Sequence, residues 1–449
     1  MKTQWATGTR GGSAGVPAAV PGVAIGVLAA GFWLVYGVSR GATAFGDSAS
    51  YLAAADALSR GATVATMRTP GYPLFIAACR GMAALLGVND LRLLVVAQVI
   101  LCAGLSTYLV YDIGLRLTER RSVGAIAGLM MAADVDLQHF TSAILSESLS
   151  VAVAVASLWL RCRDRGWRRA GWLLAVLVLI RPIFIFVPVA FAACELIRTR
   201  RIRPSVYALA PMCVVTCVWA MSSALWGGSP VAVRQYFAPL HAFGKVYESK
   251  LWREIPDAGE REIVAEAKRR GLDVYQAAKS VADAEGGSSG LASVSAHVIH
   301  ADPLGYLAVC VGVVPREFRQ GTYWPRGLQS WGRNPHWSER FSWMAHWWEP
   351  LYHATFYRSF ALFLALLAVA CVNGLGWPGA VSMMRDTFVP FVVVLFLSVA
   401  MLSLGTEEVG RLAVASHPIN GLLWALVSVR TWEMLRSLPV TPIRASQPV

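Results

Sequence analysis

Apolar segments long enough to cross a bilayer alternate with short polar segments along most of this chain. The first, residues 16–38, carries no charge, and about 20 apolar residues span the hydrocarbon core as a helix. Because more apolar segments follow it, we interpret it as an uncleaved first span rather than a secretory signal. Further spans are predicted at residues 91–115, 123–133, 144–160, 205–226, 352–372, 388–404 and 419–432.

Two local patterns refine this picture. Residues 48–59 place Tyr51, Leu52, Ala55 and Leu58 at spacings of three and four, which predicts a short amphipathic helix lying in the membrane interface. Residues 171–197 are apolar but are interrupted by Arg181-Pro182. A proline removes a helix hydrogen bond and a buried guanidinium is disfavoured in lipid, so we predict a broken hairpin rather than one span.

Composition agrees with a membrane protein. The 449 residues are 56% hydrophobic and 15% charged, with a mean hydropathy of +0.50. The net charge of +13 does not indicate nucleic acid, because the arginines form short runs between apolar segments, at residues 116–121, 161–169 and 198–203. Such runs mark cytoplasmic loops. The eight cysteines form neither a disulfide framework nor a zinc-ligand pattern.

These patterns predict an all-α polytopic membrane protein with about 9–11 transmembrane segments. Residues 1–226 form an N-terminal transmembrane module, in which residues 40–73 are the first outer loop. Residues 227–350 are polar and domain-sized, and we expect them on the outer face. Residues 351–435 carry the last spans, and residues 436–449 a cytoplasmic tail.

Several charged residues fall on the same predicted side of the membrane. Asp47 and Arg68 belong to the first outer loop, Glu147 opens a span and Arg181 marks the break, while Glu407 and Arg411 precede the last span. One carboxylate near several cations suits the transfer of a group from a lipid phosphate. The carboxylate would take the proton of an acceptor hydroxyl, and the cations would stabilise charge on the departing phosphate.

Each of these residues also has a structural interpretation. Asp47 would cap the helix at residues 48–59, and the Arg-Thr-Pro-Gly-Tyr-Pro run at residues 68–73 would simply be a rigid turn. Arg181 would extend to the membrane surface. Glu147 is harder to explain in this way, because a carboxylate at a lipid-facing helix end is disfavoured, so we expect it to face a cavity or to pair with an arginine.

Aromatic residues and one acidic turn add weaker signals. Six tryptophans between residues 324 and 348, Trp324 first, predict an interfacial belt or a domain core, with a stacking platform for sugar rings as the functional alternative. Asp134, Asp136 and His139 offer a divalent-cation site as an alternative to an ordinary polar turn.

Taken in order, these motifs resemble the GT-C glycosyltransferases that use polyprenyl-phosphate sugars, a group that includes bacterial lipid A aminoarabinose transferases and protein O-mannosyltransferases. The resemblance rests on Asp47 with Tyr51, the run at residues 68–73, Ser146-Glu147 and Arg181-Pro182, with a fainter likeness at residues 405–411. The chain lacks a second acidic residue beside Asp47 and an arginine-tyrosine pair near Arg411.

The resemblance implies a GT-C-like bundle and a sugar transferase that acts at the outer face of the membrane, by analogy the periplasmic side of a bacterial inner membrane. It implies Asp47 and Glu147 as catalytic residues, and Arg68, Arg181 and Arg411 as donor-phosphate ligands. It also implies substrate contacts from Tyr51, Tyr72, Glu407 and Trp324.

The implied partners are a polyprenyl-phosphate-linked sugar donor, the bilayer, and a lipid, glycan or protein acceptor, but not nucleic acid. No cofactor and no resident metal are required, with a divalent metal as the alternative. The rival hypothesis is a transporter or flippase that moves a polyprenyl-linked glycan or an organic ion without breaking a bond.

Overall fold

The computed structural model describes residues 19–45, 47–61, 68–162, 167–225, 232–285, 287–320 and 417–437. These residues are almost entirely helical and contain no β-strand, only one isolated bridge between Thr43 and Ala143. The prediction of an all-helical chain is confirmed for this part. The expected spans at residues 352–372 and 388–404 lie outside it.

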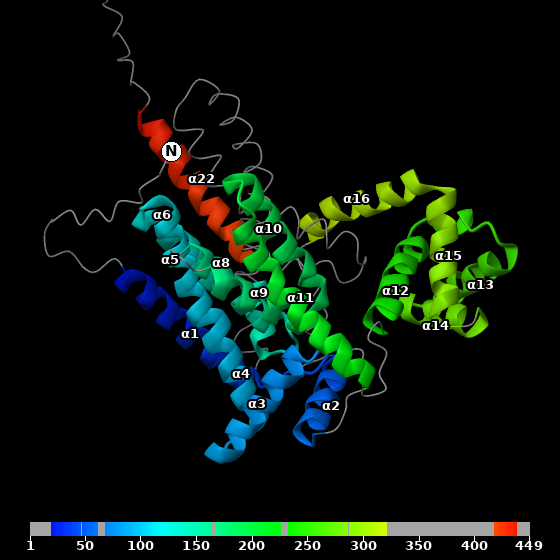
Figure 1. The fold of residues 1–449 in the computed structure, drawn as a ribbon, viewed down its shortest axis with the longest axis horizontal. Coiled ribbons are helices and arrows are strands. Elements are labelled where there is room, and N and C mark those ends of the chain that lie inside the picture. The colour runs from blue at the N-terminus through cyan, green and yellow to red at the C-terminus, as the bar shows by residue number, and fades with distance from the viewer. Residues whose placement is uncertain are drawn as a thin grey trace, which may run out of the picture.

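The first helices build one side of the bundle and its lower end in Figure 1. Two of them, α2 and α3, lie together beyond the end of α1. In chain order they are α1 (Val20–Arg40), α2 (Ser48–Ser59), α3 (Gly71–Leu86), α4 (Asp90–Val99), the π-helical η1 (Ile100–Leu105) and α5 (Ser106–Thr118). The predicted helix at residues 48–59 forms with the expected bounds.

The next elements complete the bundle. They are α6 (Arg121–Ala133), α7 (Val135–His139), η2 (Phe140–Ser142), α8 (Glu147–Arg161), α9 (Trp167–Ile180), η3 (Pro182–Ile185), α10 (Phe186–Thr199), α11 (Ile202–Leu225) and, near the C-terminus, α22 (His417–Ser437). The span predicted at residues 144–160 becomes helical only from Glu147, because the Ile144 amide bonds to Thr43 of the first loop.

The predicted break at Arg181-Pro182 is present. Helix α9 ends at Ile180, Arg181 is extended with φ −146° and ψ 116°, and Pro182 starts a short 3₁₀ turn before α10. The break therefore occurs where the proline withdraws a backbone donor.

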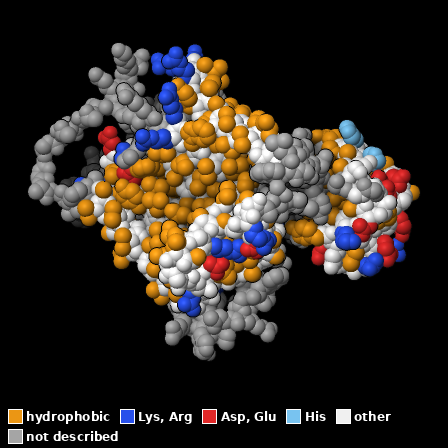
Figure 2. Space-filling model, turned by 60° about the horizontal axis from the view of Figure 1, so that its bottom comes forward, with side chains coloured by type: hydrophobic (Ala, Val, Ile, Leu, Met, Phe, Trp, Pro, Cys, Tyr) orange, Lys and Arg blue, Asp and Glu red, His pale blue; other side chains and the backbone are white. Residues whose placement is uncertain are grey.

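Three helices are long and apolar enough to cross a membrane: Val20–Arg40, the continuous Asp90–Thr118 and Ile202–Ser222. Shorter apolar helices are Gly71–Leu86 and Arg121–Ala133. The outward faces of the bundle are apolar as well, with Val27, Leu28 and Val35 of α1 more than 60% exposed. Figure 2 shows a broad hydrophobic surface on this part of the molecule. These features make the chain a helical membrane protein.

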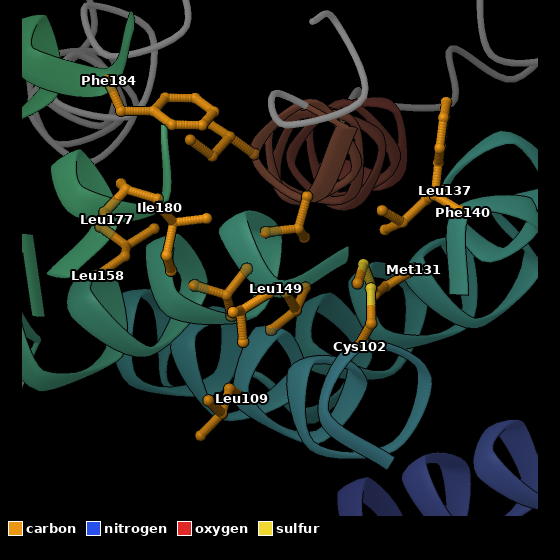
Figure 3. Packing of buried hydrophobic residues seen from close by; sticks show 14 of the residues in the cluster. Cys102, Leu109, Met131, Leu137, Phe140, Leu149, Leu158, Leu177, Ile180 and Phe184 are labelled. Carbon is orange, nitrogen blue, oxygen red and sulfur yellow. The ribbon is translucent and has the colours of Figure 1, made fainter. Parts of the chain in front are cut away.

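The main core lies between α3, α5, α6, α8, α9, α10 and α22. Leu158, Leu177, Ile180 and Phe184 group on one side of α22, and Met131, Leu137 and Phe140 lie on its other side (Figure 3). Helix α22 packs against α6 and α5. The last described helix therefore completes a core that the N-terminal helices start.

A second helical unit has a core of its own. It consists of α12 (Ala232–Glu248), η4 (Leu251–Glu254), α13 (Ala258–Arg269), α14 (Val274–Ala284), α15 (Ser288–Ala301) and α16 (Pro303–Gln320). Its loops use ordinary helix signals. Asp257 and Asp273 cap α13 and α14 through their side chains, and Gln276 completes a capping box.

Candidate functional site

The first loop is fixed to the segment that precedes α8. The Thr43 amide donates to the Ser142 carbonyl at 2.8 Å, and the Ile144 amide donates to the Thr43 carbonyl at 3.0 Å. The Ser48 hydroxyl accepts from the Phe45 amide at 2.8 Å and donates to the Ile144 carbonyl at 2.9 Å. These contacts join the start of α2 to the start of α8, although about 100 residues separate them.

Asp47 and Arg68 form an ion pair at this junction. Asp47 occupies the N-cap position of α2, but its side chain makes no capping hydrogen bond. The capping interpretation is therefore wrong for its carboxylate. Arg68 also donates from Nε to the Ser50 hydroxyl at 2.8 Å, and its guanidinium lies 4.7 Å from the centre of the Tyr51 ring. Its hydrogen bonds and the ring hold the guanidinium in one orientation.

A second ion pair joins Glu147 to Arg181, with Oε1 and Nη1 3.2 Å apart. The Glu147 side chain is 2% exposed and that of Arg181 is 11% exposed. The sequence-based expectation that Glu147 pairs with an arginine is met. The alternative that Arg181 extends to the membrane surface is not met, because its guanidinium is paired with the buried Glu147 carboxylate.

The two ion pairs are neighbours. The Tyr51 hydroxyl lies 3.2 Å from the Ser146 hydroxyl, and Ser146 directly precedes Glu147. The Thr69 hydroxyl donates to the Ile180 carbonyl at 3.1 Å, so residues adjacent to Arg68 and Arg181 are also in contact. Two acidic and two basic residues thus gather from three distant segments of the chain.

Gly71 allows this close approach. A Cβ atom at Gly71 would lie 2.7 Å from backbone atoms of Leu179 and Ile180, which a real side chain cannot do without moving the backbone. Gly71 therefore does more than form a turn, because its missing side chain lets the start of α3 contact the end of α9.

Tyr72 supports this frame from inside. Its ring packs edge-on against Tyr51 with centroids 4.9 Å apart, and its hydroxyl donates to Gln98 Oε1 at 3.0 Å. The Gln98 amide in turn donates to the carbonyls of Thr141 and Ala143 at 2.9 and 3.0 Å. Tyr72 is fully buried and Tyr51 is 4% exposed. Both are positioned to hold other side chains in place rather than to meet a ligand from solvent.

Gln98 was not singled out from the sequence. The signal that was available is its position within the apolar run of α4, where an amide needs hydrogen-bond partners.

A polar cluster lies beside this site. Asp134 Oδ1 accepts from the Leu137 amide at 2.9 Å and its Oδ2 lies 2.8 Å from His417 Nδ1, while His139 pairs with the Tyr36 hydroxyl. The side chains of Asp134, His139, His417 and Tyr36 are all polar and buried. The contact with His417 ties α22 to the end of α6 and had no counterpart in the sequence-based reasoning.

Two residues of the predicted cation site in the 134–139 turn, Asp134 and His139, have protein partners. Among the described residues, no group of three or more His, Cys, Asp or Glu side chains is arranged to hold a metal. Asp134 and His139 are instead engaged with His417 and Tyr36.

Three of the predicted site residues, Arg411, Glu407 and Trp324, lie outside the described residues. The remaining six fall into two classes. Asp47 and Arg68 are partly exposed, at 27% and 18% of their side chains, and can meet a ligand. Glu147, Tyr51 and Tyr72 are buried, and Arg181 retains 11% of its side-chain exposure.

An apolar pocket opens inside the bundle near Arg181. Its lining comes from α5, α8, α9, η3, α10 and α22, namely Val110, Ile113, Ala154, Val155, Leu158, Leu177, Phe184, Val187, Phe191, Pro418, Ile419 and Leu422. The Arg181 amide donates to the Leu177 carbonyl at 3.0 Å, and its carbonyl accepts from the Phe184 amide at 3.1 Å. Two wall residues of this pocket, Leu177 and Phe184, therefore lie within four residues of Arg181 in the chain.

No protein-family model matches the sequence, and no curated protein matches it.

Proposed function

We propose that the protein is a membrane glycosyltransferase that moves a sugar from a polyprenyl-phosphate donor to a lipid, glycan or protein acceptor. The observation that carries the proposal is the partly exposed Asp47–Arg68 pair held beside the buried Glu147–Arg181 pair. A carboxylate with positive charge next to it is what transfer from a lipid phosphate requires.

In this mechanism Asp47 is the general base. The acceptor hydroxyl attacks the anomeric carbon, its proton passes to the Asp47 carboxylate, and the bond from that carbon to the phosphate oxygen breaks. The departing phosphate takes both electrons of that bond, and Arg68 and Arg181 stabilise the resulting charge. Attack from the face opposite the phosphate inverts the anomeric centre.

Glu147 has a positioning part in this scheme. It is buried against Arg181, so it cannot take a proton from an acceptor that approaches from solvent, but it can fix the direction of the guanidinium. This supports Asp47 rather than Glu147 as the base.

The apolar pocket supports a lipid-linked donor. It is lined by aliphatic and aromatic side chains alone, and Leu177 and Phe184 place its wall next to Arg181. A phosphate held by the arginines would place the start of its prenyl chain close to these apolar side chains, with a gain that scales with the apolar area buried.

We place the site at the outer face, in a bacterium the periplasmic face of the inner membrane. The support is the predicted topology, with the arginine runs inside. A cysteine introduced at Ser288 tests it in intact cells. Labelling by a membrane-impermeant maleimide is expected, while protection until the cells are opened would reverse the orientation.

Transfer itself is tested with purified protein in nanodiscs and a polyprenyl-phosphate donor that carries a radiolabelled sugar. A transferase consumes the donor and releases polyprenyl phosphate, which thin-layer chromatography resolves. A transporter moves the intact donor across a vesicle membrane instead, so movement without release of polyprenyl phosphate would contradict the proposal.

A further inference from the structure

Helix α16 is apolar on two opposite faces. Asp302 starts it by accepting from the Gly305 amide at 2.7 Å. One face packs on the second helical unit, where Tyr306 and Val309 contact its core. The other carries Leu304 and Leu307, which are 76% and 57% exposed. A helix that is apolar all round is normally covered on all sides.

Charged pairs lie on the exposed faces of the neighbouring helices α13 and α14. On α13, Arg269 pairs with Glu262, and both side chains are more than 60% exposed. On α14, Lys279 pairs with Asp283 in the same way. Residues 303–314 of α16 contain no charged residue at all. The apolar face is therefore local to α16 and is not a property of the whole unit.

The length of this apolar run decides whether it could cross a membrane or only lie along its surface. Twelve helical residues extend about 18 Å, whereas the hydrocarbon core is about 30 Å thick. The run is too short to cross, but it suits a helix that lies along the interface.

The unit is also tethered near a membrane. Only residues 226–231 separate the end of α11, a candidate membrane span, from the start of α12. Even fully extended, that connection reaches about 25 Å. The unit cannot leave the vicinity of the bilayer.

We propose that α16 docks on the lipid surface through the face that carries Leu304 and Leu307. The helix then serves as the contact through which the second helical unit rests on the membrane. This inference does not depend on the reaction that the protein catalyses.

The test uses the full chain in nanodiscs of phosphatidylcholine and phosphatidylglycerol. A genetically encoded fluorescent amino acid replaces Leu304 or Leu307 in separate variants, and Glu262 on α13 in a control, so that no native cysteine is altered. Lipids with a nitroxide on the acyl chain near the headgroup are then included. We expect emission at positions 304 and 307 to fall about twofold or more, and emission at position 262 to stay unchanged.

Each other outcome overturns the docking. Emission that is neither shifted nor quenched at positions 304 and 307 means that the face stays in water. A blue shift without quenching by the lipid nitroxide means that protein covers it. Equal quenching at all three positions means that the unit has no preferred face toward lipid. Because two independent positions on exposed sites are used, a folding defect in one variant leaves the other to decide.

Discussion

The Tyr51 hydroxyl lies 3.2 Å from the Ser146 hydroxyl, across 95 positions of the chain. The same tyrosine ring carries the Arg68 guanidinium on its face, and Ser146 precedes the carboxylate that holds Arg181. One tyrosine therefore touches both halves of the charged site. A change at Tyr51 should reach both ion pairs, whereas a change in either pair alone should not.

Loss of the Asp47 carboxylate should abolish most of the transfer. We expect Asp47→Asn to lower kcat roughly 100- to 10,000-fold, the usual contribution of a general base, with donor binding retained. The matched control is Asp56→Asn, which removes a carboxylate from the same helix, where Asp56 pairs with Arg80. Single-turnover release of polyprenyl phosphate measures both. Undiminished transfer by correctly folded Asp47→Asn would remove the base from the mechanism.

The Glu147–Arg181 pair should behave as a unit in stability. Removing one partner leaves a buried charge alone, so Glu147→Gln and Arg181→Gln should each lower the free energy of unfolding by about 3–5 kcal/mol. The double variant should be less destabilised than the sum of the two. Unfolding by denaturant in detergent micelles measures all three proteins. Strict additivity would show that the two side chains are not coupled.

Tyr51 should separate a hydroxyl effect from a ring effect. Tyr51→Phe loses only the contact with Ser146, at a cost of about 1 kcal/mol, and should keep Arg68 in place. Tyr51→Leu also removes the ring beneath the guanidinium and should raise the apparent KM for donor as well. Ser146→Ala is the matched variant for the first effect, and adding it to Tyr51→Phe should cost little more. A KM that stays the same in Tyr51→Leu contradicts a role for the ring in orienting Arg68.

Lys245 should make the second helical unit sensitive to pH. Its side chain is fully buried beside the Cys310 thiol and 5.7 Å from the Tyr306 ring centre, and burial lowers the pKa of its ammonium from 10.5. Between the lowered pKa and 10.5 the unfolded chain binds more protons, so the free energy of unfolding rises with pH through that window. Lys245→Met should flatten this rise.

Hydrogen exchange of the α12 amides in the intact protein, corrected for intrinsic exchange, checks this between pH 7 and pH 9.5. Part of the slope should persist in the variant, because burial also lowers the pKa of Lys268. The upper limit avoids the opposite effect of Tyr306, whose pKa is raised by burial and which destabilises the fold only in more alkaline solution. An unchanged slope in Lys245→Met would assign the pH dependence to other groups.

Local signals in the sequence carried a good part of this architecture. The amphipathic spacing of Tyr51, Leu52 and Ala55 located α2, and the proline after Arg181 located the break between α9 and α10. Both depend on interactions within a few residues, which a sequence displays directly. The pairing of Glu147 with an arginine followed from the cost of a lone carboxylate near lipid.

The remaining contacts depend on which distant segments meet. Nothing local to Gln98 indicates that it will support Thr141 and Ala143, and nothing local to Asp134 names His417 as its partner. The delayed start of α8 has the same cause, since Ile144 gives its amide to Thr43 instead of to a helix. These partners lie far apart in the chain and meet only when the helices pack. A local sequence pattern therefore does not reveal them.

The π-helical turn η1, Ile100–Leu105, interrupts the long α4–α5 helix about midway. A π turn accommodates one residue more than an α turn, and one residue corresponds to about 100° around a helix axis. It therefore sets the rotational phase of the two halves. In the half before it, Gln98 faces Tyr72; in the half after it, Asp112 faces Trp159, whose indole donates to the Asp112 carboxylate at 2.7 Å. Without the extra residue, Asp112 would be rotated by about 100° relative to Gln98, so the π turn acts as an angular offset between the charged end of the bundle and the part that holds Asp112.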